Sequence, residues 1–113
     1  MQQETQIHKN RGGAMNNYGI QRILDSIESI AKEARVTFSN GTKTMIPIRK
    51  IERAGKTIRI FFYIPAEQTA RTITRVELID NRGSVLDEQT DVVEVVRRQG
   101  FMTAFEYTYS EVK

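Results

Sequence analysis

The apolar residues of this 113-residue chain change their spacing near Arg35, and this change limits the folds that the chain can adopt. Before Arg35, apolar residues recur at intervals of three and four, which is the stripe of an amphipathic helix: Ile20, Ile23, Leu24, Ile27, Ile30, Ala31 and Ala34. Asn16 or Asn17 can cap the start of this helix. After Arg35, short alternating runs lie between turn signals, a pattern typical of β-strands.

Turn signals divide the region after Arg35 into strands. Asn40-Gly41 between strand formers is the strongest short hairpin cue. The return strand, residues 43–51, contains Pro47, whose missing N–H favours the edge of a sheet. Residues 56–64 alternate cleanly and form the next strand, with two faces. One face holds Ile58, Ile60, Phe62 and Ile64, and the other holds Thr57, Arg59, Phe61 and Tyr63.

The second half of the chain continues in the same way. Residues 72–80 and 84–96 are predicted strands joined by Asn81-Arg82-Gly83, where Gly83 supplies a positive φ. After a turn at Gln99-Gly100, a last strand begins at Phe101. The predicted fold class is mostly β: an antiparallel β-sandwich or open barrel of about six or seven strands, with one N-terminal amphipathic α-helix.

The N-terminal segment differs from the rest in composition. Residues 1–15 contain few large apolar side chains, too few to offset the entropy of ordering, so we predict a disordered tail followed by a single domain at 16–113. Arg11-Gly12-Gly13 is also what a purine-rich ribosome-binding site encodes when translated. One hypothesis is therefore that residues 1–14 are an upstream leader and that the natural start is Met15; the alternative is a flexible tail that contains two glycines.

Few residues of the chain could support catalysis or metal binding. The chain has no cysteine, and its one histidine, His8, lies in the predicted tail. Phosphate-loop, dinucleotide, nucleophile-elbow and calcium-loop motifs do not occur. We therefore predict a protein that is not an enzyme and that has no catalytic residues, no metal site and no cofactor. No apolar run is long enough for a membrane span, and residues 1–10 lack the apolar middle of a signal peptide.

Positive charge is concentrated in one stretch of the chain. The whole chain carries +3, whereas residues 43–60 carry six cations against Glu52 alone. The outward face of residues 43–64 is therefore our candidate partner-binding surface, through Arg49, Lys50, Arg59, Phe61 and Tyr63. Basic and aromatic residues together also suit single-stranded nucleic acid, although a net charge of +3 makes that partner a weaker prediction. The favoured structural alternative is that Phe61 and Tyr63 pack beneath the N-terminal helix.

An aromatic stripe follows the last predicted strand. Phe101, Thr103, Phe105, Tyr107 and Tyr109 share one face at a spacing of two. Such a stripe can line a carbohydrate-binding groove, but an alternating aromatic strand is more often the core of a small sandwich. We expect Phe101 and Phe105 to lie in the core, and both interpretations stay open for Tyr107 and Tyr109.

Three segments resemble small proteins of long-tailed bacteriophages (siphophages) of Gram-positive bacteria. Residues 16–27 (NNYGIQRILDSI) are similar to the opening of these proteins. Residues 72–86 (TITRVELIDNRGSVL) resemble their recurring ITKVELID-turn-G-x-VL hairpin, and residues 101–112 are similar to their ending. The resemblance implies a tail-associated accessory protein, with a fold similar to the shoulder domain of phage receptor-binding proteins. That domain attaches the receptor-binding head to the baseplate.

The resemblance also implies partners and a location. We expect contacts with phage tail or baseplate proteins, no membrane, and a place in the virion or, during assembly, in the host cytoplasm. The family pattern includes no catalytic residue, so none is transferred to this chain. Each predicted strand and the apolar face of the helix can be buried within the predicted domain. No apolar surface is left for a second copy, so we expect a monomer in isolation. A small nucleic-acid-binding protein and a carbohydrate-binding module remain the alternative functions.

Overall fold

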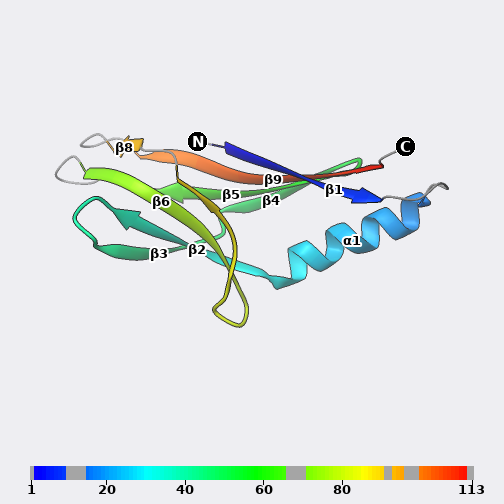
Figure 1. The fold of residues 1–113 in the computed structure, drawn as a ribbon, viewed down its shortest axis with the longest axis horizontal. Coiled ribbons are helices and arrows are strands. Elements are labelled where there is room, and N and C mark those ends of the chain that lie inside the picture. Colours follow the sequence, from blue (N-terminus) through cyan, green and yellow to red (C-terminus); the bar gives the residue numbers. More distant parts are fainter. Residues whose placement is uncertain (1, 10–14, 66–70, 91–92, 96–99, 112–113) are drawn as a thin grey trace.

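A computed structural model of the chain describes residues 2–9, 15–65, 71–90, 93–95 and 100–111. One helix, α1 (Asn17–Ile30), accompanies nine strands in this described part: β1 (Gln2–Lys9), β2 (Ala31–Phe38), β3 (Lys43–Pro47), β4 (Lys50–Ala54), β5 (Thr57–Ile64), β6 (Arg71–Asp80), β7 (Val85–Gln89), β8 (Val93–Val95) and β9 (Phe101–Glu111). The strands form two facing sheets with α1 at one end (Figure 1). The predicted class, a β-sandwich with an N-terminal helix, is confirmed.

The two sheets have different memberships. The first sheet has the strand order β1-β9-β5-β4, and the second has the order β3-β2-β6-β7, with β8 also paired to β6. All pairings are antiparallel except β1 with β9, which is parallel. As Pro47 predicted, β3 is an edge strand of its sheet.

The core lies between the inner faces of the sheets. The inward side chains of β5 are at most 1% exposed, as its alternation predicted: Ile58, Ile60, Phe62 and Ile64. The second sheet contributes Val36, Phe38, Ile73, Val76 and Leu78, all buried. The rings of Phe62 and Phe105 meet edge to face with centroids 6.2 Å apart, which is a favourable aromatic geometry.

Helix α1 covers the inner face of the first sheet near the β4–β5 turn. Ile20 and Leu24 are buried in the same core as β5. Asn16 caps the helix by accepting a hydrogen bond from the Gly19 amide at 2.9 Å, as predicted. Between the sheets, the Gln89 side chain of β7 donates to the Ala104 carbonyl of β9 at 2.7 Å and so joins the two sheets.

The helix is shorter than its apolar stripe predicted. Ala31 and Ala34, expected on the helix, belong to β2. Strand β2 pairs with β6 from Ala31 onward, and the Asn81 amide donates to the Ile30 carbonyl at 2.9 Å. A small apolar residue fits a buried strand as well as a helix, so the spacing of these alanines alone could not locate the boundary.

Two other predicted segments are divided or reassigned. The predicted strand at 43–51 consists of β3 in one sheet and β4 in the other, because the chain crosses between sheets at Ile48 and Arg49. Residues 2–9, predicted to be disordered, form β1; pairing with β9 uses backbone groups and so does not require apolar side chains. Residues 10–14 lie outside the described residues. Met15 packs against the core, although it was assigned to the tail.

Candidate interaction site

The outward face of the first sheet carries the predicted partner-binding residues of β5. Arg59 and Phe61 are half-buried, and Tyr63 is 43% exposed. The prediction that Phe61 and Tyr63 pack beneath the helix is wrong, because α1 joins the core with Ile58 and Ile60 on the opposite face of the strand. The alternation of β5 fixes two faces, but it does not say which of them the helix covers.

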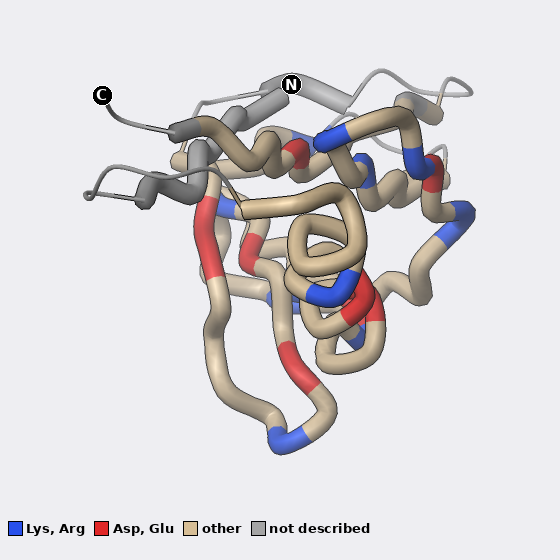
Figure 2. Tube along the Cα trace, turned by 90° about the vertical axis from the view of Figure 1, so that its right-hand side faces the viewer, with Lys and Arg blue, Asp and Glu red and all other residues tan. Residues whose placement is uncertain are grey.

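Two of the six cations of residues 43–60, Arg53 and Arg59, pair with carboxylates from other parts of the fold. Arg53 donates to the carboxylates of Asp25 and Glu28 on α1 at 2.9 and 3.1 Å. The Asp25 hydrogen bond is the main reason that the pKa of Arg53 is raised. Arg59 bonds to Glu106 of β9, whose side chain is 8% exposed. Figure 2 shows acidic and basic positions interspersed over the described part of the chain.

Lys50 and Arg49 differ in their charge environment. The Lys50 ammonium lies 3.3 Å from the Glu52 carboxylate and 5.0 Å from the centre of the Phe61 ring, within the range of a cation–π contact. Arg49 is exposed, and it forms no ion pair with any residue that the structure describes. Of the predicted surface, Arg49 therefore keeps an uncompensated positive charge.

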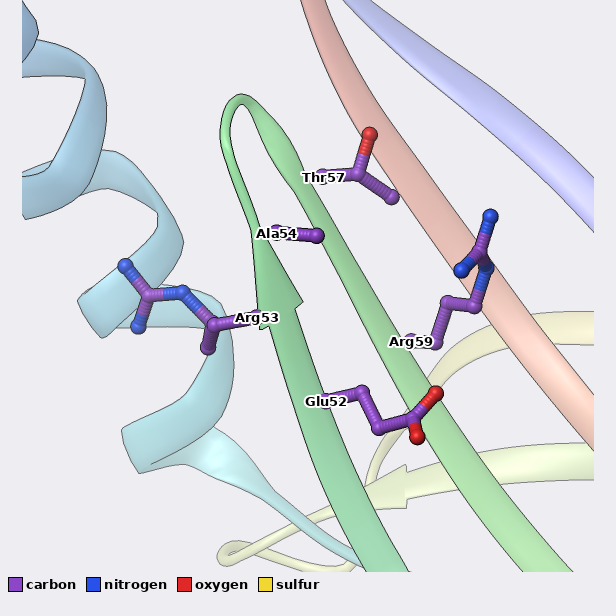
Figure 3. Close-up of a pocket in the computed structure, with 5 residues that line it drawn as sticks. All are labelled: Glu52, Arg53, Ala54, Thr57 and Arg59. Carbon is purple, nitrogen blue, oxygen red and sulfur yellow. The ribbon is translucent and has the colours of Figure 1, made fainter.

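A hollow of about 340 Å³ is lined by residues of the paired strands β4 and β5: Glu52, Arg53, Ala54, Thr57 and Arg59. Arg53 points toward α1 and Arg59 toward β9, so the two guanidinium groups point away from each other (Figure 3). The Thr57 hydroxyl is hydrogen-bonded to that of Thr108 at 2.9 Å. Arg53, Thr57 and Arg59 are thus engaged in contacts between strands or with the helix, and Glu52 pairs with Lys50 of its own strand.

A second hollow lies where the chain crosses from β3 to β4. Its volume is about 350 Å³. We call it the proline groove; its lining residues are Ile46, Pro47, Ile48, Arg49, Tyr63 and Pro65. Both prolines of the chain line it. Arg49 and Tyr63 are the two predicted partner-binding residues that reach this groove.

Local backbone geometry positions the side chains of the proline groove. Lys50 is the register partner of Phe61, yet the Arg49 amide also donates to the Phe61 carbonyl, at 2.7 Å. This hydrogen bond holds the backbone just before β4 against β5 and so fixes the position from which the Arg49 side chain projects. Tyr63 lies over Gly100; a Cβ on Gly100 would collide with the Tyr63 hydroxyl and would lie 2.7 Å from the Ile64 carbonyl oxygen.

Sequence reasoning did not identify several residues around this groove. It assigned Pro47 only to a sheet edge, and Pro65 directly follows the predicted strand at 56–64. It also did not identify Met102, the register partner of Tyr63, which is 42% exposed. The available signal was the pair of prolines: Pro47 lies within the basic stretch 43–60, and Pro65 follows it.

The aromatic stripe of β9 belongs to the core. Phe105, Tyr107 and Tyr109 are 0%, 8% and 2% exposed, so the expectation for Phe105 is confirmed and the open question for the tyrosines is answered. The Tyr107 hydroxyl donates to Asp87 of β7 at 2.8 Å, and burial is the main reason that its pKa is raised. The Phe101 side chain lies outside the described residues. The two tyrosines for which a carbohydrate groove was left open are thus inside the sandwich.

Neither a metal site nor a membrane-spanning helix is found in the described residues. Within those ranges, no group of three or more histidine, aspartate or glutamate side chains is placed to hold a metal ion. No helix there has the length and apolar character needed to cross a bilayer. In comparisons with known proteins, no family model, no curated protein and no solved structure matches the chain.

Proposed function

We propose that this chain is a non-enzymatic bacteriophage structural or tail-associated protein that acts through protein–protein contact, in the adsorption apparatus or its assembly. One observation carries the interaction role: exposed apolar side chains, Tyr63 and Met102, lie on the outward face of the first sheet, near an uncompensated cation, Arg49. Exposed aromatic and methionine side chains beside arginine are the composition typical of protein interfaces.

The assignment to a phage tail is supported by the segments that resemble siphophage proteins. The first segment contains the Asn16 cap and the buried helix residues Ile20 and Leu24. The second forms the β6–β7 hairpin, in which Asp80 accepts hydrogen bonds from the Arg82 and Ser84 amides. The segments that resemble siphophage proteins thus contain residues on which the fold of this chain depends: a helix cap, buried helix residues and a hairpin turn.

The charge distribution favours protein contact over nucleic-acid binding. A nucleic-acid groove needs several cations that are free to meet phosphates. Three basic residues of the 43–60 stretch are instead engaged with carboxylates: Lys50, Arg53 and Arg59. The burial of Tyr107 and Tyr109 likewise removes the surface on which the carbohydrate alternative depended.

Mass spectrometry of purified virions, with immunogold labelling, tests the proposal. We expect the protein in particles, with label at the tail. Two variants test whether the protein enters particles through the surface at Arg49 and Tyr63. The double variant Arg49→Glu with Tyr63→Ala is expected to reduce incorporation into virions. The control Lys56→Glu, in the β4–β5 turn, is expected to leave incorporation unchanged. Absence of the unmodified protein from both virions and isolated tail intermediates would refute the proposal.

A further inference from the structure

The proline groove is preformed by rigid neighbours. Ile46 is 9% exposed and belongs to the core, so one wall of the groove is anchored there. Pro47 and Pro65 have fixed φ angles, and Tyr63 rests against Gly100. A ligand entering this groove therefore has little protein motion to restrict, which lowers the entropic cost of binding.

The size and lining of the groove suit a short extended segment. A volume of about 350 Å³ is at the small end of the range for binding pockets. Proline and tyrosine side chains offer flat apolar walls, and aromatic-lined grooves are where polyproline II segments dock. Pro47 also has no N–H to donate, which disfavours an added strand at that position of the β3 edge. Side-chain contacts rather than a new β-ladder would hold the ligand.

Arg49 selects the charge of the ligand. It is exposed at the groove and has no ion pair with a described residue, whereas Lys50 and Arg59 have carboxylate partners. A guanidinium binds a carboxylate through two parallel hydrogen bonds, which a lysine cannot reproduce. The complementary ligand therefore has an acidic side chain next to apolar residues or prolines.

We propose that the proline groove binds a short extended segment of a protein partner, with prolines or aliphatic residues against Tyr63 and one acidic residue paired with Arg49. This inference rests on the proposed interaction role and specifies the chemistry of the partner.

Selection from a random 12-residue peptide library tests the proposal, with the full chain and its Arg49→Glu variant as separate baits. The full chain is expected to enrich peptides that carry Asp or Glu beside Pro, Leu or Ile, and Arg49→Glu to enrich Lys or Arg at that position. An enriched peptide is then synthesised and its Kd measured by fluorescence anisotropy. The Arg49→Glu change is expected to weaken binding about 10- to 100-fold, the usual strength of a hydrogen bond to a charged group.

Matched changes separate the groove from other surfaces. Replacing the acidic residue of the peptide with lysine is expected to restore binding to Arg49→Glu, and Tyr63→Ala is expected to weaken binding by a factor of about 10 or more. Lys56→Glu removes a cation at the other end of the β4–β5 hairpin and is expected to change Kd less than about twofold. Each variant is first shown to have the unfolding midpoint of the unmodified chain within a few degrees.

Three results would overturn the groove assignment: no peptide enriched by the full chain, enrichment without an acidic preference, or the same acidic preference with Arg49→Glu. Virion analysis distinguishes failure of this inference from failure of the proposed function. If Arg49→Glu with Tyr63→Ala enters virions normally, the groove is not the contact used, while the tail assignment stands. If Arg49→Glu switches the peptide preference from acidic to basic residues but the protein is absent from particles, the groove assignment stands and the tail assignment fails.

Discussion

Replacing Leu24 with alanine tests whether α1 is part of the core. Leu24 is 0% exposed and packs among residues of both sheets. The change removes three carbon atoms, which costs about 2.4 kcal/mol in transfer free energy at about 0.8 kcal/mol for each buried CH₂. The cavity left behind adds to this loss, so the free energy of unfolding is expected to fall by about 3 to 4 kcal/mol.

Urea unfolding followed by far-ultraviolet circular dichroism measures this loss. For a domain of this size, 3 to 4 kcal/mol corresponds to a decrease in thermal midpoint of roughly 12 to 30 °C. The matched control is Tyr18→Ala in the first turn of the same helix: it removes a larger side chain, but one that is 73% exposed, and it is expected to cost less than about 0.5 kcal/mol.

The comparison has a clear refuting result. Equal losses for Leu24→Ala and Tyr18→Ala, or a loss below about 1 kcal/mol for Leu24→Ala, would mean that α1 does not pack into the sandwich. If Leu24→Ala does not fold, Leu24→Met is used instead; it nearly conserves volume and is expected to cost less than about 1.5 kcal/mol.

Three further predictions concern polar and tight contacts. The Arg35 hydrogen bond at 2.8 Å holds the pKa of buried Glu77 below its ordinary value of 4.5, so this stabilisation is complete above pH 4.5 and is lost as pH falls through the lowered pKa. Glu77→Gln is therefore expected to cost about 1 kcal/mol at pH 7 in urea unfolding and much less at pH 3; an equal cost at both pH values would contradict this reasoning. Gly100→Ala is expected to displace the Tyr63 ring and lower the thermal midpoint by several degrees, with shifted NMR signals at Tyr63, and unchanged signals would disprove the close contact. Gln89→Leu leaves a β9 carbonyl without its donor between the sheets and is expected to cost about 1 to 3 kcal/mol in thermal unfolding, whereas no loss would show that the bond is unimportant.

Local patterns in the sequence predicted much of the fold. The strict alternation of β5 identified its buried face residue by residue, because neighbouring side chains in a strand must point to opposite sides. Asn40-Gly41 and Gly83 located two hairpins, since their backbones adopt positive φ at the glycines: 88° at Gly41 and 81° at Gly83. The chain has no cysteine and one histidine, at position 8, which limited the side chains that could serve in catalysis or metal binding.

Contacts between distant segments determined the remaining features. Spacing gave α1 an apolar stripe but could not choose the sheet face that it covers, and it extended the helix over Ala31 and Ala34, which pair with β6. Composition gave residues 43–60 a strong positive charge, yet Asp25, Glu28 and Glu106 offset much of it from elsewhere in the chain. Charge compensation and burial depend on which segments meet in space. For that reason, only the folded arrangement reveals that Arg49 and Tyr63 share a groove with both prolines.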